Sequence, residues 1–147
     1  MAKKTFHEIF TEVDKTSGRG NKIAVLHKYS SPALKAVLGY AYDPTVTWLL
    51  PEGTPPYKPT DEIDTHSVFY AEIRKLYLFT DGPSDAQKNL KQTRREQLFI
   101  EILESIHPDD AKVLIAMKDR RLPYKGLTAK LVQEAFPNMT KHWDSNV

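Results

Sequence analysis

Cysteine is absent from the 147 residues of this chain, and glycine is scarce, with 6 residues. The lack of cysteine excludes a disulfide scaffold, a cysteine-type zinc finger, an iron–sulfur centre and thiol catalysis. Long apolar runs are lacking as well, since none approaches the ~18 residues that cross a bilayer, and residues 1–15 are amphipathic and charged rather than leader-like. We therefore expect a soluble protein of the cytoplasm.

A strong charge of one sign is also lacking, because the formal net charge is only +2. The charges are unevenly distributed: residues 1–87 carry 10 Lys and Arg against 11 Asp and Glu, whereas residues 88–147 carry 11 against 8. The C-terminal excess fits either a solvated basic face or an anionic partner. A hydrophobic fraction of 40% in a chain of this length is typical of one globular domain, so 1–147 is expected to be a single domain.

Apolar side chains with helical spacing dominate the N-terminal part, and strand-type alternation is almost absent. A stripe at i, i+3, i+4 and i+7 predicts a first helix, and a short second helix is expected around Leu26. Ser31-Pro32 and Asp43-Pro44 are each typical of a helix start, an N-cap residue followed by proline, and predict a third and a fourth helix. The stripe of the first helix consists of Phe6, Ile9, Phe10 and Val13.

Three segments are predicted to lie outside the main helices. Residues 51–59 contain four prolines and one glycine, a density that no helix tolerates, and we expect an ordered loop over about 51–64. The PxxP spacing from Pro56 to Pro59 leaves open a Pro-rich docking ligand as an alternative. Residues 82–92 are polar and are expected to form a mobile loop, and residues 138–147 a C-terminal tail.

Helix signals return in the second half of the chain. Further helices are expected to start at Thr65 and at Thr93, where Thr93 and Glu96 match a capping box. Two more are expected to start at Pro108 and Thr128, and two acids follow Pro108 in the first turn, where the helix dipole favours negative charge. The complete pattern predicts an all-α fold, a single compact domain of seven or eight short helices.

No arrangement typical of catalysis or of a bound cofactor is visible. The five histidines lie far apart along the chain, without a close pair of ligands, so no metal site is predicted. Residues 17–22 resemble a phosphate loop only faintly, because a helix is expected before them and Ile23 follows the lysine where a P-loop needs Ser or Thr. The acids of residues 61–64 are interpreted as an acidic loop end. We expect neither enzyme activity nor a cofactor.

The strongest functional signal is a basic turn between two predicted helices, residues 118–128. Four cations and a tyrosine surround a Pro/Gly turn that leads into a helix start, where free backbone N–H groups and the helix dipole favour a phosphate. The candidate DNA-binding residues of this turn are Lys118, Arg120, Arg121, Tyr124, Lys125, Gly126 and Thr128. A second basic group consists of Lys88, Lys91, Arg94 and Arg95. The pattern fits charges that keep the protein soluble as well as it fits DNA contacts.

The segment from Arg94 to Phe136 contains a distinctive order of motifs. A helix with an apolar face is followed by Pro108 and the run Ala111-Lys112-Val113-Leu114-Ile115, then by the basic turn ending in Gly126-Leu127-Thr128, and by Phe136-Pro137. This order resembles the end of the N-terminal all-α DNA-binding domain of ATP-dependent DNA ligases. The resemblance implies that phosphates are bound by Arg120, Arg121, Lys125, Gly126 and Thr128, with Lys118 and Lys130 as outer electrostatic contacts.

Two features depart from the ligase pattern. Leu122-Pro123-Tyr124 lengthens the turn that faces DNA in the ligases. The K-x-D-G motif of the nucleotidyltransferase is absent, because the one Asp-Gly pair, Asp81-Gly82, has Phe79 where the lysine is required. The chain is therefore not expected to be a ligase by itself.

The whole chain also looks like a group of small proteins of T-even-like tailed phages, on segments such as 50–59 and 122–126. That resemblance implies the cytoplasm of a host cell. We expect a non-enzymatic DNA-binding accessory protein of phage replication or repair that binds duplex or nicked duplex with weak sequence preference. Two alternatives stay open: an adaptor that binds a replication or host protein, which an exposed patch with Tyr57 and Trp143 would favour, and a structural component of the virion.

Overall fold

Proline and hydroxyl side chains mark several helix boundaries in the computed structural model, which describes residues 4–143. Within these residues the chain forms eight α-helices and one 3₁₀ helix, and its β pairing is limited to an isolated antiparallel bridge between Trp48 and Thr80. The predicted all-α, single-domain fold is confirmed. The elements are α1 (Phe6–Lys15), α2 (Arg19–Lys28), α3 (Pro32–Tyr42), α4 (Val68–Glu72), the 3₁₀ helix η1 (Ile73–Phe79), α5 (Asp85–Asn89), α6 (Gln92–Ser105), α7 (Pro108–Lys118) and α8 (Ala129–Ala135).

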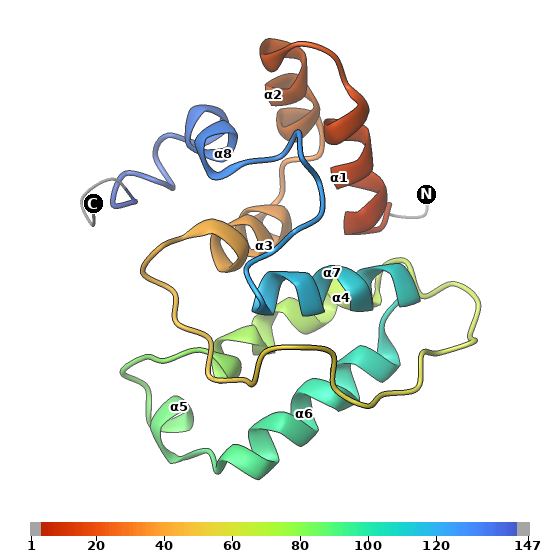
Figure 1. Cartoon of the computed structure of the whole chain (residues 1–147), viewed down its shortest axis with the longest axis vertical. Coiled ribbons are helices and arrows are strands. Elements are labelled where there is room, and N and C mark those ends of the chain that lie inside the picture. Colours follow the sequence, from red (N-terminus) through yellow and green to blue (C-terminus); the bar gives the residue numbers. More distant parts are fainter. Residues whose placement is uncertain (1–3, 144–147) are drawn as a thin grey trace.

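Helix α7 lies in the middle of the molecule (Figure 1) and packs against α1, α3 and α6. Helices α2 and α8 pack against each other at one end, and α5 and α6 form the opposite end. One hydrophobic core extends from α1 to α8, because each of the larger helices contributes an apolar face to it. Five apolar side chains of α7 are buried in this core: Ala111, Val113, Leu114, Ile115 and Met117.

Local capping signals place three helix starts correctly, while the helix expected to start at Thr65 begins only at Val68. The starts predicted at Ser31, Pro108 and Thr128 are confirmed, and the Ser31 and Thr128 side chains each accept an N–H of the first turn of their helix. The start predicted at Thr93 is wrong. Helix α6 already begins at Gln92, and its N-cap residue Lys91 provides no capping side chain, so Thr93 lies inside the first turn.

The helix predicted after Asp43-Pro44 is also wrong. The Asp43 carboxylate accepts the N–H and the hydroxyl of Thr45, at 2.9 and 2.7 Å, and this local pairing forms a turn rather than a helix start. Farther along, the backbone N–H of Leu49 donates to the carbonyl of Phe79 at 2.7 Å. Because the backbone groups find partners far away in the sequence, the segment does not need helical hydrogen bonds.

The Pro-rich segment is tied to the helices beside it. The backbone N–H of Lys58 donates to Glu104 of α6 at 2.8 Å, and the side chain of Gln92 donates to the carbonyl of Leu49 at 2.8 Å. Lys118 at the end of α7 donates to two carbonyls of the same segment, those of Pro51 and Gly53. The segment forms neither helix nor strand, but these contacts give its first part fixed partners.

The other two predicted loop segments contain more structure than the sequence indicates. Helix α5 lies within 82–92, and Ser84 and Gln87 form a capping box at its start. In the predicted tail, Trp143 is only 4% exposed, while residues 144–147 lie outside the described part of the chain. No helix among residues 4–143 is long and apolar enough to cross a membrane.

Candidate nucleic-acid interface

The basic turn begins at the C-terminal end of α7, which closes in a Schellman motif. Arg120 adopts the left-handed conformation with a φ of 61°. Its N–H donates to the carbonyl of Met117 at 3.0 Å, and the N–H of Arg121 donates to that of Ala116 at 2.9 Å. Glycine is the usual residue at this left-handed position, so the arginine here must contribute something that glycine cannot.

The Arg120 guanidinium joins the end of α7 to the end of α3. It donates to the backbone carbonyls of Tyr40 and Asp43, at 3.0 and 2.6 Å. Both carbonyls lie in the last turn of α3 or just after it, where backbone acceptors lack helical partners. In this structure the donors of Arg120 bind carbonyls of the protein and hold the turn in place, while the assignment of Arg120 to a phosphate stays a prediction.

Two other predicted cations are buried. The side chain of Lys118 is 2% exposed and donates to the carbonyls of Pro51 and Gly53 and to Asp119, the last at 2.5 Å. Arg95 is 5% exposed and donates to the carbonyls of Leu78 and Gln87 and to the side chain of Gln92. Both side chains use their donors within the protein, so neither presents a free donor to a ligand at the surface.

Tyr124 packs into the core instead of standing on the surface. Its ring is buried against Phe10, with centroids 5.6 Å apart, and its hydroxyl lies 2.8 Å from Nδ1 of His7. Burial is the main cause that raises the pKa of the Tyr124 hydroxyl above its ordinary value. Tyr124, predicted as a candidate DNA-binding residue of the turn, is therefore an anchor between the turn and α1 in this structure.

The backbone N–H of Gly126 and the hydroxyl of Thr128 also have partners within the protein. Gly126 donates to Oδ1 of Asp14 at 2.6 Å, and a Cβ at this position would lie 3.1 Å from the Asp14 Cα and 2.6 Å from the Lys22 amine. A side chain at this position would therefore crowd Asp14 and Lys22, and glycine favours this close approach of the turn to α1. The Thr128 oxygen accepts the N–H of Leu131 at 3.1 Å, so it caps α8. Both residues shape the turn; the Gly126 N–H is already used within the protein, whereas the exposed Thr128 hydroxyl accepts in the cap and keeps its own O–H as a donor.

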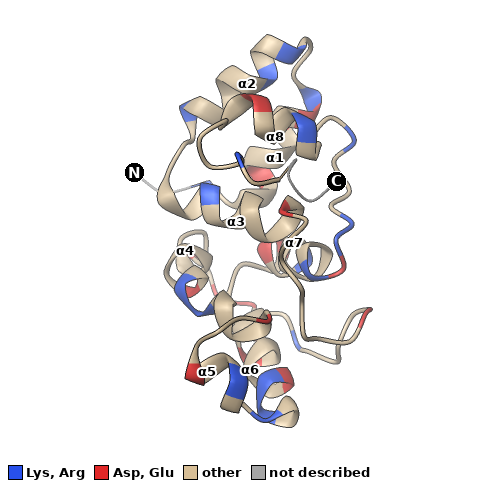
Figure 2. Ribbon diagram, turned by 90° about the vertical axis from the view of Figure 1, so that its left-hand side faces the viewer, with Lys and Arg blue, Asp and Glu red and all other residues tan. Residues whose placement is uncertain are grey.

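Arg120, Arg121, Lys125 and Lys130 are the predicted cations of the turn and α8 that lie on the surface, and Arg120 is held there by the two carbonyls at the end of α3. The Arg121 side chain is 76% exposed and pairs at 3.0 Å with Glu52, which is 66% exposed. Lys125 and Lys130 are exposed, and no ion pair within residues 4–143 holds either one. Figure 2 shows basic residues along the edge of the α7–α8 turn and on α8. We call Arg121, Lys125 and Lys130 the basic edge.

The second predicted group lies elsewhere. Lys88, Lys91 and Arg94 are exposed at α5 and the start of α6, at the opposite end of the molecule (Figure 2). Arg94 pairs with Glu101 at 3.2 Å, and both side chains are about half exposed. The structure therefore does not bring Arg94 and Arg95 together with the turn.

A family model describes most of this chain. It matches residues 9–124, from α1 to Tyr124 in the basic turn, and its description is a family of unknown function, DUF6433. The chain belongs to DUF6433. No curated protein and no solved structure matches the chain.

In this DUF6433 member, one further cation adjoins the basic edge. Lys112 is exposed on α7 and lines two hollows, one of about 200 Å³ with Pro123 and Tyr124, the other of about 400 Å³ with Arg121 and Tyr57. A lysine on the solvent face of a helix gives no signal in the sequence, so Lys112 was not among the predicted site residues. Within residues 4–143, no His, Asp and Glu side chains are grouped so that they could hold a metal ion.

Proposed function

We propose that this protein binds the phosphate backbone of duplex or nicked duplex DNA through the basic edge and Lys112, as a non-enzymatic accessory protein of phage replication or repair. One observation carries the proposal: the exposed cations project from a turn whose backbone is fixed on both sides. Arg120 ties the turn to α3, and Tyr124 and Gly126 tie it to α1. Because the backbone of the turn is already fixed, only the side chains of its cations lose conformational entropy when they meet phosphates.

The expected affinity is modest and salt-dependent. Four cations can neutralise about four phosphates, and each adds close to 0.9 to the slope of log K against log salt. The pair of Arg121 with Glu52 is open to solvent, so phosphate can replace the carboxylate at small cost. The basic edge has no group aimed at base edges, and phosphate contacts carry no sequence information, which supports a weak sequence preference.

Fluorescence anisotropy tests this function. Labelled intact duplex, nicked duplex and single strand are titrated with the full chain at ~50 and ~200 mM salt, a range over which phosphate-directed binding falls steeply. We expect the triple variant Arg121→Ala, Lys125→Ala, Lys130→Ala to lower the salt slope by about three phosphates' worth, uniformly across sequences.

The matched control removes three exposed cations from the other end of the molecule: Lys88→Ala, Lys91→Ala and Arg94→Ala. Both variants lose three positive charges, so a general charge effect weakens both equally. If the control variant lost DNA binding while the basic-edge variant kept it, the proposed surface would be wrong. Absence of binding to all three DNA forms at ~50 mM salt would overturn the function itself.

A second candidate is a protein-interaction adaptor. The patch that the sequence suggested is not formed, because Trp143 is buried and Tyr57 is partly covered. The observation that favours an adaptor is an apolar groove of about 400 Å³ between the Pro-rich segment and α6, lined by Leu50, Pro51, Phe99 and Ile100 among others. A chain that binds no DNA but is captured by a replication protein would favour this function.

A further inference from the structure

Asp110 places a carboxyl group in the packed contact between α1 and α7. Its side chain belongs to the first turn of α7 and is 0% exposed. One oxygen accepts the backbone N–H of His7 at 3.2 Å, at the N-terminus of α1, where donors lack helical partners. The other oxygen is buried without a hydrogen-bond partner among the described residues. A buried carboxylate with an unpaired oxygen is costly, whereas a neutral carboxyl is much less so.

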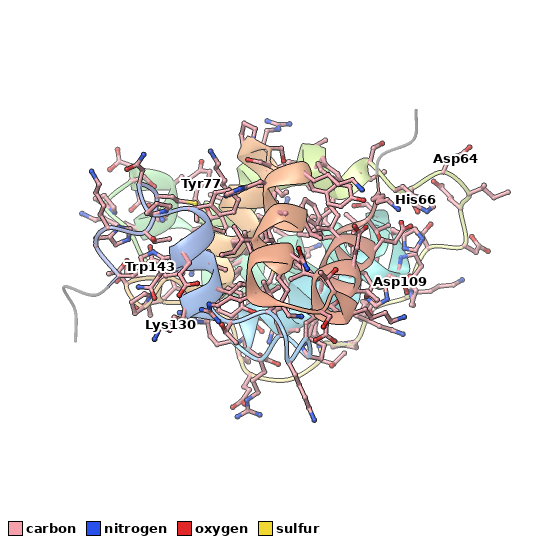
Figure 3. All side chains as sticks on the ribbon, turned by 90° about the horizontal axis from the view of Figure 1, so that it is seen from above. Asp64, His66, Tyr77, Asp109, Lys130 and Trp143 are labelled. Carbon is pink, nitrogen blue, oxygen red and sulfur yellow. The ribbon has the colours of Figure 1, made fainter. Side chains whose placement is uncertain are left out.

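The surroundings of Asp110 do not offer a compensating cation. None of the ion pairs among residues 4–143 includes it, and Glu8 and Asp109 add negative charge nearby. Figure 3 shows His66 and Asp109 on the same side of the molecule, away from Lys130. The titratable groups around Asp110 are His7 and Glu8 of α1, His66 in the preceding loop, Tyr70 of α4, His107 and Asp109 at the start of α7, and Tyr124 of the turn.

Burial and neighbouring charge oppose the ionised form of Asp110. Burial raises its pKa to about 7, the N–H groups of His7 and Phe6 lower it in part, and Asp109 and Glu8 raise it further. The charge of this group therefore changes near neutral pH, inside a contact that is closed to solvent.

His7 connects Asp110 to the basic turn. The backbone N–H of His7 binds the Asp110 carboxyl, and the imidazole of the same residue lies 2.8 Å from the Tyr124 hydroxyl. A movement of the first turn of α1 therefore also displaces the partner that anchors Tyr124. The two contacts share one residue, so they are expected to loosen together.

We propose that Asp110 is a proton-dependent contact between α1 and α7: its neutral carboxyl keeps the two helices closed, and its ionisation loosens the first turn of α1 together with the Tyr124 anchor. The direction follows from linkage. A carboxyl that is harder to ionise in the folded protein than in the unfolded chain stabilises the fold at low pH. This stabilisation is complete below the ordinary pKa of 3.8, and it is lost as the pH rises from there through the folded-state pKa of about 7. The inference goes beyond DNA binding, since the contact exists whatever the turn binds.

Hydrogen exchange of the full chain, followed by mass spectrometry at pH 6 and pH 8 and corrected for intrinsic rates, tests the proposal. We expect the protection of amides in residues 6–10 and 120–127 to fall about tenfold between the two pH values, as one group titrating near 7 allows. Amides inside α6 serve as an internal reference and should not change. Equal protection at both pH values would overturn the proposal.

The isosteric variant Asp110→Asn should abolish the pH response. Asp109→Asn, its half-exposed neighbour in the same turn, should retain the response with a midpoint shifted to lower pH, because the Asp109 charge raises the pKa of Asp110. Tyr124→Phe keeps the ring but removes the hydroxyl, so α1 should still respond while residues 120–127 no longer follow it. A response retained by Asp110→Asn would overturn the proposal. A direct ¹³C titration of the Asp110 carboxyl in the wild type needs no variant to fold, and a midpoint below about 5 would exclude the mechanism.

Discussion

Lys118 shows at the scale of one residue how burial changes the role of a charge. In the sequence it belongs to a basic turn, but in the structure its amine is surrounded by Asp119 and two backbone carbonyls. A buried ammonium group is tolerated only when it is paired and fully hydrogen-bonded. Lys118 therefore connects the Pro-rich segment to α7, which is a structural role.

We expect Lys118→Met to destabilise the fold by about 3 kcal/mol, because it leaves two carbonyls and the 15%-exposed Asp119 without their cation. Urea unfolding followed by circular dichroism measures this loss. The control Lys125→Met removes an exposed lysine of the same turn and should stay within about 0.5 kcal/mol of the wild type. Equal stability of the two variants would show that Lys118 is not an anchor.

Arg120 illustrates the same principle in the backbone. A left-handed conformation costs a non-glycine residue about 1 kcal/mol. The guanidinium offsets this cost with two hydrogen bonds to carbonyls at the end of α3, which a glycine could not make. A predicted DNA ligand thus joins two helix ends in this structure.

Helix ends decide the structure at the scale of elements. The Thr128 hydroxyl caps α8, and this helix connects the basic turn to α2. Thr93 has the fuller capping signal in the sequence, a capping box with Glu96, yet it lies within the first turn of α6 and has no such role. Two threonines that both look like N-caps in the sequence therefore make different contributions to stability.

Replacing each threonine by alanine separates these roles. Thr128→Ala should cost about 1 kcal/mol of unfolding free energy, because an N–H of α8 loses its acceptor. Thr93→Ala should change stability by less than about 0.5 kcal/mol, since alanine is the better helix former. Both values come from urea denaturation under the same conditions. A larger loss for Thr93→Ala would contradict the helix boundary described above.

At the scale of the whole molecule, α7 makes one cooperative unit from the two ends. It packs against α1, α3 and α6, and its apolar residues belong to the same core as those of α2 and α8. A domain of this size with one continuous core usually unfolds in a single transition.

The two tryptophans of the chain report on different parts of this unit. Trp48 lies beside η1 through the bridge to Thr80, and Trp143 lies buried after α8. In the variants Trp48→Phe and Trp143→Phe, fluorescence of the remaining tryptophan and circular dichroism should give coincident urea transitions within each variant. Separate transitions would show that the two ends unfold independently.

The candidate site could be predicted only in part. Arg121, Lys125 and Lys130 are exposed at the expected place, but the DNA-binding role stays a prediction. Local sequence cannot show that Arg95 and Lys118 point inward, because the carbonyls that accept their hydrogen bonds belong to segments far away in the chain. The importance of Lys112 likewise depends on the hollows that other segments form around it.

The sequence by itself determined the helical class and several helix starts, since apolar spacing and caps such as Ser31 and Thr128 act within a few residues. The tertiary structure decided what competes with those local signals. It turned residues 43–50 into a turn followed by a segment paired with the end of η1 and the residues after it, and it divided the basic turn into residues that anchor it within the protein and an exposed edge. The reason is physical. Burial and long-range hydrogen bonds change the free energy of folding by more than local propensity does. They depend on contacts between distant segments, which neighbouring residues do not specify.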